Sequence, residues 1–358
     1  MPTAAAFIGL GRVHKHYCSL ISNGMIPEIS IVAVCDKNVE LVAMYSKVYS
    51  CLGFDSFQSL IESTSLDLVI ILTPSGSHYE HAKFFLERGI NVLVEKPISM
   101  LISQAISLQK LSLLHGAYLG VIFQNRYNPA IRALKKAFQK NRFGKIITSS
   151  VRLRWCRLQE YYEDCWHGRW LTDGGVINQQ AIHHIDAMQW ILGPVDSVCG
   201  TYTNRLNFLE AEDTFAAVLI FHDGSLGTIE ATTAARPKDM EASFSIVGEK
   251  GYASIGGIAL NEVCEWVFDE PYEEDTDIIS CNQLVPSGYG LGHIPLLKNV
   301  CSYLQKDESS CLIELSSAIY TTILVHSLYR SCEIGGWVSV GDKMSSAQLG
   351  RNSASYNA

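Results

Sequence analysis

Residues 4–12 read Ala-Ala-Ala-Phe-Ile-Gly-Leu-Gly-Arg, an apolar run that ends in two glycines separated by one residue. The run predicts a buried β-strand, and the apolar-periodic segment after it predicts a helix. In a strand–turn–helix unit of this kind, Gly9 permits the tight turn and Gly11 lets backbone N–H groups approach a phosphate. The stretch therefore predicts a dinucleotide site, although His14 occupies the place of a third glycine.

Four more apolar runs follow in the first third of the chain, separated by amphipathic segments. The alternation predicts an α/β Rossmann domain over residues 1–123, with a parallel sheet covered by helices on both faces. The expected strands span residues 4–8, 29–34, 68–72, 91–94 and 118–122, and the expected helices span 41–48, 78–88 and 101–115.

Beyond Gly144 the pattern changes to long strands, which predicts an α+β domain over residues 124–340 with a large, mostly antiparallel open sheet. Asp223-Gly224 is expected to form a hairpin turn between two of these strands. Residues 341–358 are small and polar, and we expect a disordered tail there. The expected strands span residues 146–155, 214–221, 225–233 and 241–247, and the expected helices 177–192, 294–305 and 316–334.

Composition excludes several classes of partner. The net charge is −8 and no run of lysine or arginine is present, which argues against nucleic acid. No apolar segment approaches the roughly 18 residues of a membrane span, so we expect no membrane partner. The 11 cysteines are scattered without a CxxC pair, which argues against a disulfide framework or a zinc cluster and favours the reducing cytoplasm.

Asp36 ends the second expected strand, about 25 residues after the glycine turn. An acidic side chain there accepts hydrogen bonds from the 2′-hydroxyl of an adenine ribose and repels a 2′-phosphate, so Asp36 favours NAD over NADP. The neighbouring Lys37 weakens this preference. A role for Asp36 as a helix N-cap stays open.

Glu95-Lys96-Pro97 follows the apolar run 92–94. Open α/β sheets bind ligands outside the carboxyl ends of their strands, so Lys96 is a candidate catalytic residue. Pro97 cannot extend a central strand, and the chain should leave the sheet here. The alternative is a surface lysine in a loop.

Together these residues resemble the Gfo/Idh/MocA family of oxidoreductases. The resemblance rests on Gly9-Leu10-Gly11, Thr73-Pro74 with His78, Glu95-Lys96-Pro97, residues 124–129 and 143–146, and Gly174-Gly175 with His183 and Asp186. It implies a second domain whose open sheet covers the nicotinamide and forms the interface of a homodimer or homotetramer. The cofactor-binding residues that it implies are Gly9, Gly11, Arg12, Val13, Asp36, Thr73, Pro74, His78, Glu95, Asn125 and Trp170.

Residues 166–183 are similar to the branch of this family that oxidises C3 of UDP-N-acetylglucosaminuronate in surface-polysaccharide biosynthesis. The resemblance implies 2-oxoglutarate as a second substrate that regenerates NAD. Asp173 and Gln179 depart from the pattern of the branch, and a glutamine cannot act as a base. The expected substrate-binding residues are Arg126, Tyr127, Arg154, Tyr161, Asn178, Gln179 and Tyr289.

Oxidation of a secondary alcohol needs a group that takes the hydroxyl proton. His183 is our candidate base, with Lys96 donating to the substrate oxygen, and the two roles stay interchangeable. We expect no metal, because His183 and His184 point about 100° apart on a helix and cannot hold one ion. The alternatives are an inositol or free-sugar dehydrogenase and a non-catalytic regulator that binds a dinucleotide.

Overall fold

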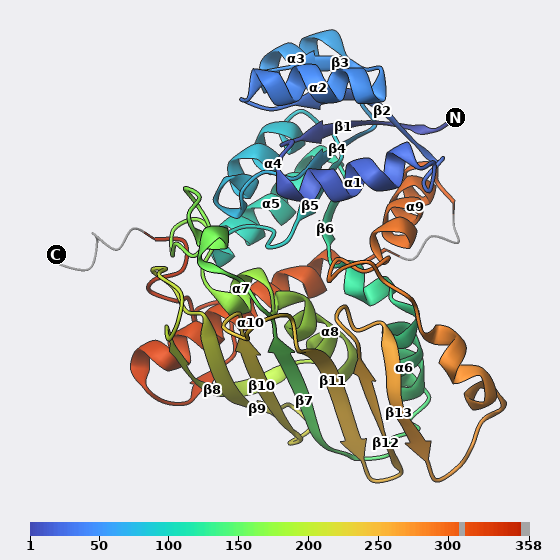
Figure 1. Ribbon diagram of the computed structural model, residues 1–358, viewed down its shortest axis with the longest axis vertical. Coiled ribbons are helices and arrows are strands. Elements are labelled where there is room, and N and C mark those ends of the chain that lie inside the picture. The colour runs from blue at the N-terminus through green and yellow to red at the C-terminus, as the bar shows by residue number, and fades with distance from the viewer. Residues whose placement is uncertain (308–311, 352–358) are drawn as a thin grey trace. The chain divides into compact units, whose positions relative to one another are not determined.

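The computed structural model describes residues 1–307 and 312–351. They form two compact units, the first from residues 1–122 and 293–319 and the second from residues 123–292 and 320 onward (Figure 1). The chain changes units after residue 122, one residue before the boundary that the sequence predicts. Segment 293–319 lies in the first unit, whereas the predicted second domain runs without interruption from 124 to 340.

The sheet of the first unit has six strands in the order β3-β2-β1-β4-β5-β6. All its neighbours pair in parallel, and this order is that of a doubly wound dinucleotide-binding fold. The predicted α/β Rossmann fold is confirmed. The strands are β1 (Thr3–Ile8), β2 (Ile29–Cys35), β3 (Leu52–Phe54), β4 (Leu68–Ile71), β5 (Val92–Glu95) and β6 (Leu119–Ile122).

The central strands of this sheet are buried on both faces, as parallel strands covered by helices must be. The strand order reverses between β1 and β4, and ligands of such sheets bind at the carboxyl ends beside that point. Gly9, Thr73 and Lys96 follow the ends of β1, β4 and β5. The helices are α1 (Arg12–Ser22), α2 (Val39–Tyr49), α3 (Phe57–Ser63), α4 (His78–Leu86), α5 (Ile102–His115) and α9 (His293–Leu304).

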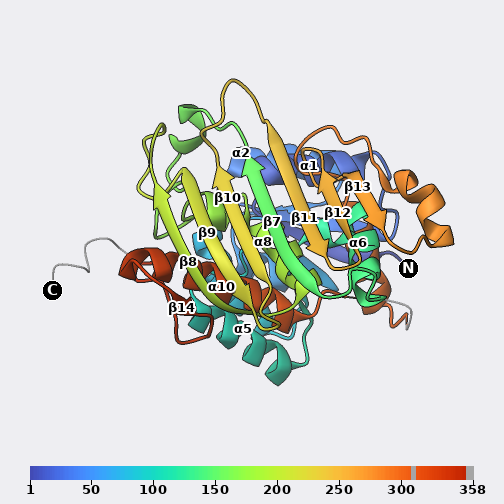
Figure 2. The same ribbon diagram turned by 90° about the horizontal axis from the view of Figure 1, so that it is seen from below.

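The sheet of the second unit has eight strands in the order β13-β12-β11-β7-β10-β9-β8-β14. Its neighbours are antiparallel except β7 and β10, so the predicted mostly antiparallel sheet is confirmed (Figure 2). The strands are β7 (Ile146–Arg154), β8 (Val195–Thr203), β9 (Thr214–Phe221), β10 (Leu226–Thr232), β11 (Glu241–Gly248), β12 (Gly251–Gly256), β13 (Glu262–Phe268) and β14 (Val338–Ser339).

Helices cover one face of this sheet, and Figure 2 shows α8 and α10 behind the strands. Along β7, Val151 and Leu153 are fully buried whereas Arg152 is exposed on the opposite face. The helix predicted over 177–192 is divided in two, because the chain turns at Gln180 and Ala181. The helices are α6 (Pro129–Gln139), α7 (Val176–Gln179), α8 (Ile182–Leu192) and, from residue 320, α10 (Leu315–Ile334).

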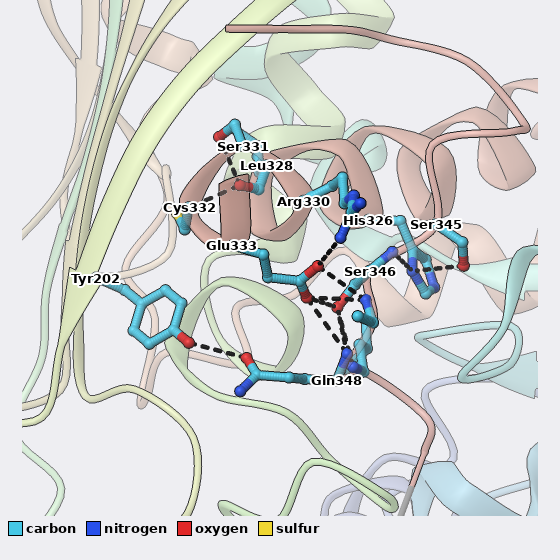
Figure 3. A network of polar contacts seen from close by, with 12 residues as sticks. Tyr202, His326, Leu328, Arg330, Ser331, Cys332, Glu333, Ser345, Ser346 and Gln348 are labelled. Carbon is cyan, nitrogen blue, oxygen red and sulfur yellow. Dashed lines mark hydrogen bonds and ion pairs between the residues drawn. The ribbon is translucent and has the colours of Figure 1, made fainter. Parts of the chain in front are cut away.

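The segment after β14 differs from the predicted disordered tail over residues 341–351. Glu333 Oε1 accepts hydrogen bonds from Ser346 Oγ at 2.6 Å and from the Ala347 amide at 2.9 Å (Figure 3). Ser346 and Leu349 are almost fully buried. The small polar residues that suggest disorder here satisfy a carboxylate at the end of α10 instead. Residues 352–358 of the predicted tail lie outside the described residues.

Candidate active site

The glycine turn between β1 and α1 is the first element of the site. Gly9 has a φ of +92°, and a Cβ atom there would lie 2.8 Å from Thr73. A Cβ atom on Gly11 would meet nothing within 4 Å. The predicted residues Arg12 and Val13 open α1, whose first N–H groups receive no side-chain cap. These N–H groups and the open space beside Gly11 fit the pyrophosphate of a dinucleotide.

Asp36 holds the end of β2 against this glycine turn. Its Oδ2 accepts a hydrogen bond from the Leu10 amide at 2.7 Å, and its Oδ1 accepts one from the Asn38 amide at 2.8 Å. Asn38, not Asp36, is the N-cap of α2. Each carboxylate oxygen can still accept from a ribose hydroxyl, and the negative charge opposes a 2′-phosphate.

His78 connects the ends of β4 and β5. Its Nδ1 lies 2.7 Å from the carbonyl oxygen of Pro97, and its Nε2 lies 2.8 Å from that of Thr73. Burial lowers the pKa of His78 to about 4, so the ring is neutral and only one of its nitrogens donates at a time. The ring therefore fixes the place where the chain leaves the sheet at Lys96. On the β4 side, the predicted residue Pro74 directly follows Thr73.

Glu95 is a buried carboxyl group directly beside Lys96. Its Oε1 accepts a hydrogen bond from the Tyr17 hydroxyl at 2.8 Å, and its Oε2 accepts one from the Lys96 amide at 3.2 Å. His293 Nε2 lies 3.9 Å from the same Oε1. Burial raises the pKa of Glu95, while the charge of Lys96 and the hydrogen bond from Tyr17 act in the opposite direction. Sequence reasoning missed Tyr17, which sits in a helix without a motif.

His183 lies on α8 of the second unit. It is partly exposed, whereas Ile182 and His184 on either side are buried. Its ring packs edge-on against Phe123, with 6.0 Å between the ring centroids. Within α8, Trp190 and Leu192 are also partly exposed, and the remaining residues are buried. The side chain of His184 is part of the core, and burial lowers its pKa to about 4.

A buried glutamate supports the turn that begins α7. Glu212 Oε1 accepts hydrogen bonds from the Tyr329 hydroxyl at 2.9 Å and from the Ile177 amide at 3.2 Å. A Cβ atom on Gly175 would lie 2.0 Å from Glu212 Oε2, so only glycine fits there. Burial raises the pKa of Glu212 to about 8. Sequence reasoning missed Glu212, because no motif marks it. Only its complete burial in the structure singles it out.

Several predicted substrate residues already have partners within the second unit. Arg126 forms a bidentate ion pair with Asp186, and both side chains are buried. Arg154 pairs with Glu230 at 2.8 Å and with Glu241 at 3.1 Å, and the register of β7 places it on the face of the sheet opposite to Leu153. These contacts favour structural roles for both arginines.

The other predicted residues of this unit are spread over three segments. Asn178 Nδ2 donates to the Asp173 carbonyl at 2.6 Å, and Gln179 follows it on α7 with 8% exposure. The Asn125 side-chain oxygen is buried without a partner among the described residues, which fits a role toward a ligand. Two of the predicted aromatic residues pack within the unit: Trp170 against Tyr329, and Tyr127 against the guanidinium group of Arg132. The other two are more accessible. Tyr161 lies on the segment after β7, and Tyr289 is 37% exposed.

The described residues contain no group of three or more His, Cys, Asp or Glu side chains that could hold a metal ion. Over the same residues, every helix is too short or too polar to cross a membrane.

Family comparisons cover both units. The oxidoreductase family with the NAD-binding Rossmann fold matches residues 4–123, and the GFO/IDH/MocA C-terminal domain matches residues 131–254. Among characterised proteins, the chain is 26% identical over 278 residues to D-glucoside 3-dehydrogenase of Escherichia coli, covering 71% of this chain and 77% of the relative. It is 25% identical to scyllo-inositol 2-dehydrogenase (NAD(+)) of Bacillus subtilis, covering 72% and 75%.

Two solved structures resemble this chain over most of its length. The WlbA dehydrogenase from Bordetella pertussis, in complex with NADH and UDP-GlcNAcA, has 31% identity and a TM-score of 0.90, over 95% of this chain and 98% of that one. The WlbA dehydrogenase from Chromobacterium violaceum, in the same kind of complex, has 30% identity and a TM-score of 0.88, over 95% and 96%. Both of those structures contain NADH and UDP-GlcNAcA.

Proposed function

Because the chain belongs to the Gfo/Idh/MocA family of NAD-binding oxidoreductases, we propose that it takes a hydride from C3 of a UDP-linked N-acetylaminouronate. The observation that carries this proposal is the likeness over 95% of the chain, at 31% identity, to a dehydrogenase crystallised with UDP-GlcNAcA. The stretch 166–183, which resembles the same branch, supports it independently of the fold. An inositol or free-sugar dehydrogenase is the alternative, and the B. subtilis relative favours it.

NAD, when bound, supplies the carbon atom that accepts the hydride. The residues that would hold it in the first unit are the Gly9–Gly11 turn, the first N–H groups of α1 and the Asp36 carboxylate. In the second unit, Asn125 and Trp170 stay proposed cofactor ligands. The unpartnered oxygen of Asn125 supports its role.

Lys96 and His183 would handle the proton of the substrate hydroxyl. Lys96 would donate to the substrate oxygen, and His183 would accept the proton, or the two would exchange these roles. Two observations support these assignments. His183 is partly exposed on α8, and His78 fixes the backbone directly after Lys96. A purely regulatory protein would need neither residue.

The substrate carries a carboxylate and a diphosphate, which arginine binds well. Arg126 and Arg154 are engaged by acidic partners, so we propose that exposed Arg169 contributes to holding the anion instead. Tyr161, Asn178, Gln179 and Tyr289 stay proposed substrate contacts. Gln179 would orient a sugar hydroxyl without acting as a base.

The open face of the second sheet supports a homodimer or homotetramer. The pairing registers place exposed apolar side chains from β9, β10, β11 and β12 on one face, with β7 between β10 and β11. Exposed apolar side chains gathered on one sheet face commonly mark a contact between subunits. The residues are Val218, Leu226, Val247 and Tyr252, each between 41% and 48% exposed.

A coupled assay tests the proposed reaction. Purified protein is mixed with UDP-N-acetylglucosaminuronate and 2-oxoglutarate, and we expect a 3-keto sugar and 2-hydroxyglutarate. The 3-keto sugar would be the product that the proposed role in surface-polysaccharide biosynthesis supplies. Lys96→Ala and His183→Ala should each lower the rate by about 10²- to 10⁴-fold. Lys83→Ala, on an exposed residue, is the control.

The absence of both products would overturn the proposed substrate pair. Turnover of an inositol or a free sugar in the same assay would favour the alternative. Full activity of both variants would overturn the catalytic assignment.

A further inference from the structure

A row of titratable side chains in the first unit leads from Glu95 toward the protein surface. Glu95 and His293 are 7% and 1% exposed, and His16 is only partly buried. His293 Nε2 lies 3.9 Å from Glu95 Oε1, and the rings of His293 and His16 meet edge-on with 4.8 Å between their centroids. The three side chains come from β5, α9 and α1, and Figure 1 shows α9 beside α1.

The row begins directly at Lys96, and neither His293 nor His16 is among the residues expected to hold the dinucleotide or the sugar. Each oxidation of an alcohol releases one proton, which must reach solvent before Lys96 or His183 can act again. We propose that Glu95, His293 and His16 form a route by which the proton taken up at Lys96 leaves the protein. The inference rests on the proposed part of Lys96 in proton transfer.

Each step of the route moves one proton between named atoms. The Lys96 ammonium group gives a proton to the Glu95 carboxylate, and Glu95 Oε1 passes it to Nε2 of His293. His293 then releases a proton from its other ring nitrogen toward His16, which passes one to water. After these steps Lys96 is neutral, Glu95 is again a carboxylate and both imidazoles are neutral.

The groups facing the row fit this direction of transfer. Burial raises the pKa of Glu95, so the carboxyl group accepts a proton more readily than an exposed glutamate does. Burial lowers the pKa of His293 and of His16, so both rings are neutral at rest, and each holds a proton accepted from Glu95 only briefly before releasing it. The 3.9 Å between Glu95 Oε1 and His293 Nε2 exceeds a hydrogen bond, and a small shift of either side chain closes it.

Tyr17 offers the competing explanation that Glu95 only fixes the end of β5. Its hydroxyl donates to Glu95 Oε1 at 2.8 Å, and its ring packs 5.2 Å from that of His293. Tyr17→Phe removes this hydrogen bond and keeps the ring. If Glu95 is only structural, this variant should be slower than His16→Gln. If the route operates, His16→Gln should be the slower one.

Stopped-flow measurements test the route with whichever sugar the enzyme oxidises, so failure of the nucleotide sugar as substrate does not end the test. NADH absorbance reports hydride transfer, and a pH-indicator dye reports proton release. We expect His16→Gln to slow proton release and steady-state turnover by about tenfold, with the first hydride transfer changed less than about twofold. Added imidazole should restore the lost rate. Exposed His115→Gln is the matched control.

A second measurement needs no substrate and tests the electrostatic coupling between Glu95 and the two histidines, without which the route cannot operate. Ring nitrogen shifts of the histidines are followed by NMR against pH in the wild type and in Glu95→Gln. The route requires the titrations of His293 and His16 to move by about half a pH unit or more, while His115 stays unchanged. Unchanged titrations of His293, or proton release in His16→Gln at the wild-type rate, would overturn the proposal.

Discussion

Arg126 and Asp186 form a buried bidentate ion pair, with Arg126 Nε 2.7 Å from Asp186 Oδ2 and a terminal guanidinium nitrogen 2.6 Å from Oδ1. Thr321 also donates its hydroxyl to Asp186 Oδ1, at 2.6 Å. The pair joins the segment after β6 to α8, and it therefore holds the helix that carries His183. An arginine that sequence reasoning assigns to the substrate is thus engaged in the core.

Asp186→Asn should strongly destabilise the second unit, because it leaves the buried charge of Arg126 without a counter-charge. We expect a loss of about 3–5 kcal/mol. All six tryptophans lie in the second unit, so their fluorescence during urea unfolding reports on this unit. Lys238→Ala, at an exposed position of the same unit, should cost no more than about 0.5 kcal/mol. Equal unfolding midpoints for the two variants would contradict the structural role of the pair.

Gly175→Ala should displace α7. Its Cβ atom would lie 2.0 Å from Glu212 Oε2 and 2.3 Å from the Glu212 carbonyl oxygen, and the backbone oxygen cannot move aside. We expect a loss of about 1–3 kcal/mol in the same fluorescence assay. Gly336→Ala is the control, since a Cβ atom there meets nothing within 4 Å. If Gly175→Ala unfolds at the same urea concentration as the wild type, the turn has room for a Cβ atom and the described contact with Glu212 is wrong.

Glu212 should make the stability of the second unit depend on pH. Its pKa rises from 4.5 to about 8 on folding, so the folded state binds the proton more tightly between these pH values. Stability should therefore fall as the pH rises from 4.5 to about 8, and level off above that. Glu212→Gln removes the titrating group and keeps an oxygen acceptor. The stability of this variant relative to the wild type should increase over the same range, as unfolding midpoints at several pH values would reveal. A constant difference across the range contradicts the assignment.

Asp36→Ser should reduce the preference for NAD over NADP. The substitution removes the charge that opposes a 2′-phosphate and loosens the hydrogen bond at 2.7 Å to the Leu10 amide. We expect NAD to bind about tenfold more weakly and the ratio of the two affinities to narrow. Fluorescence titration with both dinucleotides measures this, with Asp55→Asn as a control on an exposed carboxylate. An unchanged ratio of the NAD and NADP affinities would show that Asp36 does not contact the adenine ribose.

The sequence predicts much of the fold because its signals are local. The apolar runs that become β1, β4 and β5 are buried on both faces, and the glycine turn needs no distant partner to be recognised. β3 escapes prediction because it has three residues, of which Leu52 is 52% exposed. The turn between α7 and α8 escapes it because the apolar period continues through Gln180.

The site residues that sequence reasoning missed act through contacts distant in the chain. Glu212 is 117 residues from Tyr329, and Tyr17 is 78 residues from Glu95. Neither carries a motif, so only the fold reveals the pairing. The ordered segment after β14 is a similar case, since Ser346 is held by a carboxylate on α10 rather than by its own neighbours.

The most direct test of the proposed reaction follows the hydrogen on C3. UDP-N-acetylglucosaminuronate that carries deuterium at C3 is incubated with the enzyme and NAD, without 2-oxoglutarate, and the NADH is analysed by mass spectrometry. We predict NADH that contains one deuterium, and none when the label is on C4. Reduction of NAD without transfer of the C3 label, or with transfer of the C4 label, would contradict the account.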